Sequence, residues 1–301
     1  MSQDNELGSG EATPPNSDEI AYWNSEVASR WAAFQEQIDR AFAPLSAAGL
    51  ASANVKTAQA VLDIGCGCGA TLLQLGDAVG PDGSVVGVDV SQPMLAAAEQ
   101  RVLAFGLANV RCVLADASTF AFGEHAFDLA FSRFGVMFFD DPVGAFANLR
   151  RSLRRDGRLV FLCWRDLAAN PWFHVPAEAV RPHVPPQPQP DSQVPGPLAF
   201  ADPDHVRSVL ERAGFDGVQF EAFNAKLPLG DRMRAIELVS QVGPTSRLLA
   251  GADDRARANA KLALDHAFKT HEMDGDIVLG AGVWIVSARN AAAPIPRPRA
   301  T

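Results

Sequence analysis

A glycine-rich segment between a short apolar run and a helix constrains the fold of this 301-residue chain more than any other feature. Residues 60–64 are typical of a buried strand, and glycine follows at positions Gly65, Gly67 and Gly69. Glycine adopts backbone angles that are closed to other residues and lets a ligand approach the main chain. The helix that follows, through Leu75, presents free N–H groups in its first turn. This arrangement predicts a ligand-binding turn, which alone suits a dinucleotide as well as other nucleotide-like ligands.

Strands and helices alternate on either side of this turn. Apolar runs typical of strands recur along the first half of the chain at 60–64, 84–88, 110–114, 127–131 and 158–164. Ser91 is expected to cap one intervening helix, with Pro93 in its first turn. Another helix begins at Asp141-Pro142 and ends before Asp156-Gly157. Such alternation predicts an α/β fold, a doubly wound and mainly parallel sheet covered by helices on both faces.

The alternation of strands and helices does not continue beyond either end of this region. Apolar residues recur in steps of three or four from Trp23 to Phe42, which predicts one amphipathic helix that ends near Pro44. The proline-rich segment 171–200 predicts a loop or lid rather than a strand or a long helix. The remaining expected elements are a helix at 203–213, a strand at 218–223, helices at 231–250 and 253–270, and a strand at 277–288.

These elements predict a ligand-binding core that is capped by helices before and after it. The expected segments are a disordered N-terminus at 1–17, a helix capping the site at 18–45, the ligand-binding core at 46–165, a proline-rich lid loop at 166–202, a core helix and strand at 203–229, a helical lid at 230–272, a final strand at 273–289 and a flexible tail at 290–301.

Charge and cysteine content argue against several classes of protein. The formal net charge is −9, and basic residues cluster only at 150–155. A nucleic acid is therefore not expected as a partner or substrate. The four cysteines lack the spacing of a disulfide framework, which indicates a reducing, cytoplasmic location. No apolar run of about 18 residues occurs, so a membrane span is not expected, and the polar, acidic start does not resemble a signal peptide.

Two acidic residues lie at the ends of strands, at positions where a side chain can bind a nucleoside. Asp89 ends the second strand, 20 residues after Gly69, where a carboxylate accepts hydrogen bonds from ribose hydroxyls. A helix-capping role for Asp89 is the alternative, but Ser91 already fills it. Asp116 ends the third strand, where an acid can accept a hydrogen bond from an adenine amino group while the Ala117 N–H meets a ring nitrogen. The alternative for Asp116 is an ordinary turn residue.

Together these segments resemble the class I S-adenosylmethionine (SAM)-dependent methyltransferases, through the sequences VLDIGCGCG, VVGVDVSQPML, VLADA, FDLAFSRFGVMFF and LRRSLRRDGRLVFLCW. The resemblance covers residues 60–165 strongly and is nearest to the small-molecule branch similar to ubiquinone and menaquinone methyltransferases. It implies a Rossmann-like sheet of seven strands with the last one antiparallel, SAM as cofactor and S-adenosylhomocysteine (SAH) as product.

The resemblance also implies which residues contact the cofactor. Asp63 and the three glycines would line the methionine end, and the main chain of Ser132 would meet the methionine amino group. The full set comprises Trp31, Asp63, Gly65, Gly67, Gly69, Asp89, Val90, Met94, Asp116, Ala117 and Ser132.

Methyl transfer is an in-line displacement for which the protein supplies position and surroundings. A general base is needed only when the acceptor must lose a proton. The predicted base is His174, with Asp166 and Tyr22 less favoured. The residues expected to contact the methyl acceptor are Tyr22, Arg133, Phe134, Arg165 and Trp172. No metal site is expected, since the adjacent Asp140-Asp141 pair is typical of a solvated helix start.

The expected function is methylation of an oxygen, nitrogen or carbon atom of a small metabolite. Two alternatives remain open at this stage. An NAD-dependent oxidoreductase would use the same glycine turn, although the pattern from Asp63 to Gly69 and the presence of Asp116 oppose it. A non-catalytic SAM-binding protein would carry the same cofactor residues. The sequence leaves open whether the protein forms a homo-oligomer.

Overall fold

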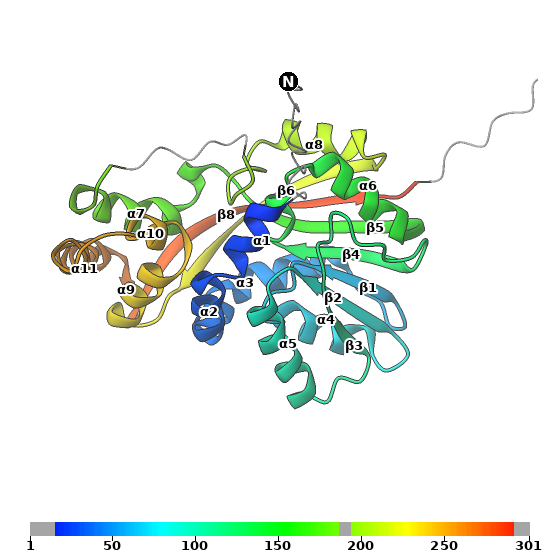
Figure 1. The fold of residues 1–301 in the computed structure, drawn as a ribbon, viewed down its shortest axis with the longest axis horizontal. Coiled ribbons are helices and arrows are strands. Elements are labelled where there is room, and N and C mark those ends of the chain that lie inside the picture. Colours follow the sequence, from blue (N-terminus) through cyan, green and yellow to red (C-terminus); the bar gives the residue numbers. More distant parts are fainter. Residues whose placement is uncertain (1–15, 187–193, 292–301) are drawn as a thin grey trace, which may run out of the picture.

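The computed structural model describes residues 16–186 and 194–291, and a mixed β-sheet lies at its centre (Figure 1). The main sheet has the order β3-β2-β1-β4-β5-β8-β6, in which β8 is antiparallel to both of its neighbours. This confirms the predicted seven-stranded sheet with an antiparallel last strand. The strands are β1 (Ala60–Ile64), β2 (Ser84–Asp89), β3 (Val110–Leu114), β4 (Phe127–Arg133), β5 (Leu153–Trp164), β6 (Asp216–Pro228) and β8 (Asp276–Arg289), and the short β7 (Glu272–Met273) pairs with the start of β8.

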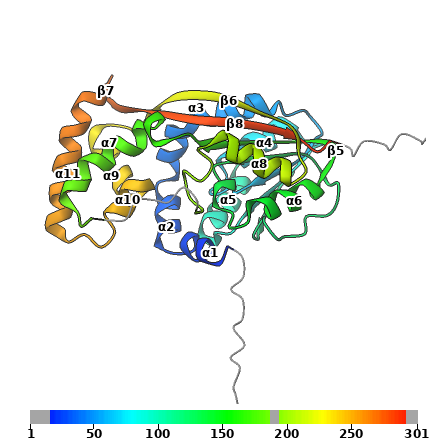
Figure 2. The same ribbon diagram turned by 90° about the horizontal axis from the view of Figure 1, so that it is seen from above.

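Helices cover both faces of the sheet, as the alternation predicts (Figures 1 and 2). Helices α3, α4 and α5 pack on one face, and α6 and α8 pack on the other. Their bounds are α3 (Gln35–Ala53), α4 (Ala70–Val79), α5 (Gln92–Ala104), α6 (Pro142–Ser152) and α8 (Pro203–Arg212). Ser91 caps α5 through a bond from Met94 N, with Pro93 in the first turn. Short 3-10 helices occur at Val136–Phe138, Leu167–Ala169, Arg181–His183 and Lys269–His271.

The single N-terminal helix predicted from the apolar stripe is wrong, because three helices replace it. Helices α1 (Ser17–Trp23) and α2 (Glu26–Ala33) precede α3. The helical conformation is interrupted at Asn24-Ser25, where Ser25 Oγ accepts a hydrogen bond from Val27 N at 3.3 Å, and again at Phe34. Helix α3 then continues through Pro44. It packs closely on β5, since a Cβ at Gly49 would lie 2.3 Å from Leu162 Cδ1. Packing therefore outweighs the hydrogen bond that a proline removes.

A second group of helices lies beyond one end of the sheet, where β6 and β8 extend past the other strands (Figure 2). The group comprises α7 (Pro171–Val180), α9 (Arg232–Gln241), α10 (Gly243–Leu248) and α11 (Asp254–Phe268). Helix α7 corrects the expectation of a loop at 171–200. It begins at a proline, which helices tolerate in their first turn, and it buries Trp172 and Phe173. The residues at 187–193 lie outside the described part of the chain.

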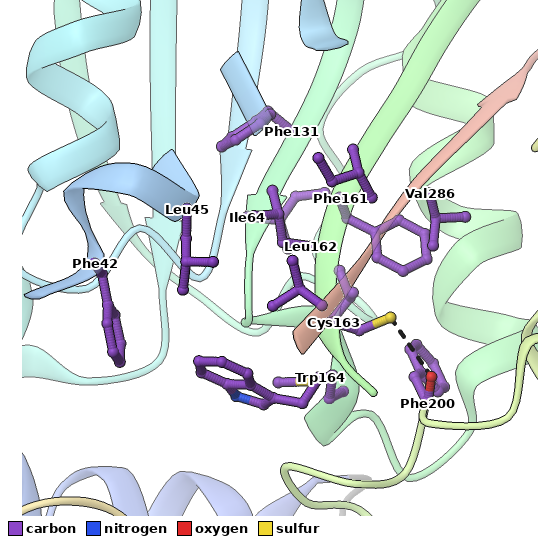
Figure 3. Packing of buried hydrophobic residues seen from close by; sticks show 14 of the residues in the cluster. Phe42, Leu45, Ile64, Phe131, Phe161, Leu162, Cys163, Trp164, Phe200 and Val286 are labelled. Carbon is purple, nitrogen blue, oxygen red and sulfur yellow. Dashed lines mark hydrogen bonds between the residues drawn. The ribbon is translucent and has the colours of Figure 1, made fainter. Parts of the chain in front are cut away.

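The core between these layers is continuous and apolar. Figure 3 shows Phe42 and Leu45 of α3 beside Leu162 and Trp164 of β5. On β5, the Cys163 thiol donates to the Phe200 carbonyl oxygen at 3.5 Å, and both residues are buried. This packing fixes the ends of β1 and β5 relative to α3. The predicted flexible tail at 290–301 is wrong for Asn290, which is buried and donates to Leu153 O at 2.9 Å, and residues 292–301 lie outside the described part of the chain.

Candidate cofactor and acceptor site

A cavity of about 870 Å³ lies at the carboxyl ends of the parallel strands β1 to β5. Its walls also come from α1, α2, α3, α7, α10 and the loop before α8. Strand β1 lies between β2 and β4, so the order of the strands reverses there, and ligands of open α/β sheets bind at such a point. The volume lies toward the upper end of the range of roughly 300–1,000 Å³ that is typical of small-molecule sites.

The glycine turn forms the floor of this cavity. Gly65, Gly67 and Gly69 have φ values of 65°, 54° and 84°, all in the left-handed region that favours glycine. The N–H groups of Gly65 and Cys66 both donate to Val88 O, at 2.9 and 3.1 Å, which ties the turn to the end of β2. The turn leads directly into the first turn of α4, where no side chain caps the free N–H groups. The floor therefore offers main-chain donors to a ligand.

Asp89 lies at the end of β2 on the same side of the cavity. Its Oδ2 accepts from Gly67 N at 2.7 Å, and its Oδ1 accepts from Ser91 N at 2.8 Å. Burial raises the pKa of Asp89, and the N–H groups of Ser91 and Gly67 oppose this shift. A carboxylate offers about four acceptor positions, so the two oxygens retain capacity for a pair of hydroxyl donors. Asp89 therefore orients the glycine turn and keeps acceptor positions for a ligand.

Asp63 and Arg133 lie together at the inner end of the site. Asp63 is fully buried; its Oδ2 accepts from Thr71 Oγ1 at 2.6 Å, whereas its Oδ1 has no hydrogen-bond partner among the residues that the structure describes. Burial raises the pKa of Asp63 to about 7, against the hydrogen bond from Thr71 and the charge of Arg133. Arg133 lines the cavity and donates to Ser46 Oγ at 2.7 Å, and burial lowers its pKa. An unsatisfied acceptor on Asp63 therefore lies just behind the lining of the cavity, beside the cation of Arg133, which lines it.

Asp116 follows β3, and its carboxylate is bound by the start of the N-terminal segment. Asn16 Nδ2 donates to both carboxylate oxygens, at 3.0 and 2.9 Å, and to Ser118 Oγ at 2.9 Å. Ser118 donates to the same carboxylate from N at 2.8 Å and from Oγ at 2.7 Å. Asn16 is itself buried. The expected disorder over 1–17 is thus wrong for the last two residues, while 1–15 lie outside the described residues.

Aromatic side chains form one wall of the cavity. The Phe134 ring stacks on Trp164 with centroids 4.0 Å apart, and Phe42 meets Phe134, Trp164 and Trp172 edge-on at 5.7 Å each. All four residues line the cavity. Trp172 Nε1 is buried, and within 16–186 and 194–291 it has no hydrogen-bond partner. The wall therefore suits an apolar, ring-bearing ligand, with a buried indole N–H close by.

Polar side chains from α1, α7 and α10 complete this half of the cavity. His174 Nδ1 lies 3.7 Å from Glu178 Oε1, and both residues belong to α7 and line the cavity. Arg247 Nε donates to the Tyr22 hydroxyl at 2.9 Å, with its guanidinium carbon 4.6 Å from the centre of the Tyr22 ring. Helix α1 is therefore linked to α10 across the cavity.

Most of the residues assigned from the sequence meet at this cavity. Those that line it are Tyr22, Trp31, Gly65, Gly67, Asp89, Val90, Met94, Asp116, Ala117, Arg133, Phe134, Trp172 and His174. Asp63, Gly69 and Ser132 lie outside the lining. Gly69 precedes α4 and faces Ala98, and the buried Ser132 donates from Oγ to Ile64 O at 2.7 Å. Their roles toward a cofactor stay predictions.

Arg165 lies outside the lining of the cavity, and its predicted substrate contact stays a prediction. Arg165 follows β5, but its Nη1 donates to Asn224 Oδ1 of β6 at 3.1 Å. Its guanidinium carbon lies 5.0 Å from the centre of the Trp284 ring on β8. These contacts direct the side chain to the β6–β8 side of β5, away from the cavity. Asp166, the less favoured base, accepts from Ala169 N at 2.8 Å and does not line the cavity either.

Several residues of the site could not be identified from a local sequence pattern. Asn16 falls in a polar segment without periodicity, and its partner Asp116 lies 100 residues away. Arg247 and Glu178 lie on helices whose facing sides follow from tertiary packing alone. Phe42 belongs to the apolar stripe, but its place beside the cavity depends on the break before α3.

The described parts of the chain give two further findings. Across 16–186 and 194–291, no group of three or more His, Cys, Asp or Glu side chains is arranged to hold a metal ion. Over the same ranges, no helix combines the length and the apolar character needed to cross a membrane. The four cysteines are unpaired.

Comparison with known proteins places this geometry in a family context. A family model described as a methyltransferase domain matches residues 61–157, about a third of the chain. The chain is 38% identical over 105 residues to the aklanonic acid methyltransferase DauC of Streptomyces sp. (strain C5), covering 35% of this chain and 48% of that protein. It is 34% identical over 109 residues to the demethylmenaquinone methyltransferase of Geobacillus kaustophilus (strain HTA426), covering 36% of this chain and 47% of that protein. The matches span about half the length of these relatives.

A solved structure extends the likeness of fold beyond the matched segment. The YcgJ protein of Bacillus subtilis superposes with a TM-score of 0.52 at 18% sequence identity. The superposition covers 82% of this chain and 98% of that chain. The two proteins share the fold.

Proposed function

We propose that this chain, which contains a class I SAM-dependent methyltransferase domain, moves a methyl group to an oxygen, nitrogen or carbon atom of a small metabolite by in-line displacement. The observation that supports this most strongly is the continuity of the cavity. The glycine turn, Asp89, Phe134 and Trp172 all line this one cavity. A nucleoside cofactor and an apolar acceptor could therefore share one space.

The residues at the sheet ends fit SAM at three points. Asp63 Oδ1, buried without a partner, would accept from the methionine ammonium group. Arg133 was expected to hold an anionic acceptor, but its place beside Asp63 favours the carboxylate of the cofactor. Asp89 would accept from the ribose hydroxyls with the acceptor positions that Gly67 and Ser91 leave open. At Asp116 the fit requires the displacement of Asn16.

When bound, SAM supplies a methyl group on a positively charged sulfur. The chain contributes alignment, and holding the acceptor in line with the methyl group accounts for roughly 7–11 kcal/mol of a barrier. The rings of Phe42, Phe134 and Trp172 would hold an apolar acceptor and exclude water. His174 would take the proton of an acceptor that must lose one. The proposed acceptor is a small molecule with a ring system.

The proposal is tested by binding and transfer together. SAM or SAH, but not NADH, is expected to raise the melting temperature of the purified protein. Radiolabel from methyl-labelled SAM should then appear in the small-molecule fraction of a cell extract. Stabilisation by NADH alone would favour an oxidoreductase. Binding of SAM without transfer to a broad set of acceptors would favour a non-catalytic SAM-binding protein.

Replacement of His174 by glutamine is expected to lower the transfer rate at neutral pH by at least tenfold. A positioned general base contributes typically 10²–10⁴-fold, and glutamine keeps the size and polarity of the side chain without a titrating nitrogen. The measurement is the initial rate of label transfer at saturating SAM, with SAH affinity as the check on the cofactor half. His183→Gln is the matched control, because His183 does not line the cavity. Equal rates for the two variants would contradict the assignment.

SAH binding is expected to tighten as pH rises toward 7, because the cofactor ammonium favours ionised Asp63. Burial raises the pKa of Asp63 to about 7 in the folded protein, far above its value of roughly 3.9 in an unfolded chain. Below pH 7 the group must therefore release a proton on binding, which costs up to about tenfold in affinity per pH unit. Without ligand, the same shift lowers folding stability as pH rises from about 4 to 7, since the folded protein retains a proton that the unfolded chain has lost.

The measurement is the dissociation constant of SAH from pH 5.5 to 8 by calorimetry, in buffers of different ionisation enthalpy to count released protons. Asp63→Asn should remove most of this pH dependence while keeping an acceptor for Thr71. A wild-type affinity that stays constant below pH 7 would contradict the role of Asp63.

A further inference from the structure

A strap formed by residues 16–24 lies along the cavity, and it is attached by polar contacts and by the edge-on packing of Trp23 against Trp31 and Phe138. Helix α1 within it buries none of its own residues. Asn24 Nδ2 donates to Val90 O at 2.8 Å, and Gln92 N donates to Asn24 Oδ1 at 3.0 Å. Tyr22 accepts from Arg247 at 2.9 Å. Because no residue of α1 is fully buried, this segment is expected to open at a smaller free-energy cost than the core.

The attachment at Asn16 involves a carboxylate whose acceptor positions are all in use. Asp116 Oδ1 accepts from Asn16 Nδ2 and Ser118 N, and Asp116 Oδ2 accepts from Asn16 Nδ2 and Ser118 Oγ. A carboxylate offers about four such positions. Asp140 N also donates to Asn16 Oδ1 at 2.7 Å, so the side-chain amide is fixed from both ends. No acceptor position on Asp116 is left for a further donor.

The group that Asn16 presents has the chemistry of the adenine amino group. Both are planar NH₂ donors attached to a delocalised system, and a carboxylate accepts either one. If Asn16 only oriented Asp116 for binding of the adenine base, one acceptor position on the Asp116 carboxylate would remain open for the adenine amino group. Both oxygens are instead bonded twice, and both Asn16 and Asp116 line the cavity. The contact therefore competes with a nucleoside.

We propose that Asn16 gates the cofactor site, because its side-chain amide occupies the carboxylate of Asp116 that the adenine amino group takes when SAM or SAH binds. The strap must release Asp116 before the cofactor enters and rebinds it after the cofactor leaves. This inference rests on the proposed function, since it assumes a SAM-binding cavity with the adenine at Asp116. It adds a residue that limits cofactor affinity rather than one that contributes to it.

The test compares SAH binding to the full chain and to Asn16→Ala. Removal of the competing contact is expected to tighten SAH binding by about threefold to tenfold, as for the loss of one net intramolecular hydrogen bond. The association rate should rise by a similar factor, measured by stopped-flow fluorescence of Trp23 and Trp31, which line the cavity. Asn16→Asp keeps the size of the side chain but places a second carboxylate against Asp116. It is expected to change affinity in the same direction.

The matched control repeats the comparison in the Asp116→Ala background. There Asn16→Ala should leave SAH affinity unchanged, because the two groups no longer compete. A gain that persists without Asp116, or weaker or unchanged binding in the single variant, would overturn the inference while the proposed function stands. Failure of the wild-type chain itself to bind SAH would overturn both. Melting temperatures of all variants establish that each is folded.

Discussion

Substitution of Gly65 by alanine is expected to abolish measurable cofactor binding and to lower the melting temperature by roughly 5–10 °C. Gly65 has a φ of 65°, and a Cβ there would lie 2.7 Å from Gly135 Cα in the segment after β4. The opposing atom belongs to the main chain, so no side chain can rotate away. Strained backbone costs about 1–3 kcal/mol, and an overpacked contact costs about as much again. The turn must move, and its hydrogen bonds to Val88 O and Asp89, which hold it against the end of β2, are then disturbed.

Gly106→Ala is the matched control for this substitution. Gly106 has a nearly equal φ of 68°, but a Cβ there would meet nothing within 4 Å. It carries the backbone strain without the contact and lies away from the glycine turn. Calorimetric titration with SAH and thermal unfolding of both variants separate the two effects. Binding by Gly65→Ala that equals binding by Gly106→Ala would refute the claim that the turn needs this close approach to Gly135.

The sheet could be predicted from the sequence because each of its parallel strands is a short apolar run bounded by turn residues. The boundaries of β1 and β3 agree with the runs at 60–64 and 110–114. The division of the N-terminal segment into three helices could not be predicted, because the apolar residues recur in steps of three and four across the interruptions at Asn24-Ser25 and Phe34. Periodicity reports which residues share an apolar face and is insensitive to a change of helix direction.

The site residues likewise divide into those that a local sequence pattern identifies and those that depend on tertiary packing. Asp89 could be placed because its role depends on a strand end and on a fixed distance from the glycine turn. Arg165 could not be placed in the same way, because a position after a strand leaves the direction of a long side chain open, and here the side chain contacts Asn224 and Trp284. Asn16 depends on a partner 100 residues away, so no local pattern reports it.

Replacement of Asp89 by alanine is expected to weaken SAH binding by about 5- to 150-fold, or about 1–3 kcal/mol. The variant removes the acceptor proposed for the ribose hydroxyls and leaves Gly67 N and Ser91 N without their partner. These two consequences can be separated with an SAH analogue that lacks the ribose 2′-hydroxyl. The wild-type chain should bind this analogue more weakly than SAH, whereas Asp89→Ala should bind the two alike, because the interaction is already lost.

The pattern of these four affinities distinguishes a ligand contact from a purely structural role. If Asp89 only orients the glycine turn, removing the 2′-hydroxyl costs the same in both proteins. If it accepts from the ribose, the penalty appears in the wild type alone. Unchanged SAH affinity in a folded Asp89→Ala variant would exclude both roles. The raised pKa of Asp89, caused by burial, sharpens the expectation, because a carboxylate held away from water gains more from each donor that reaches it.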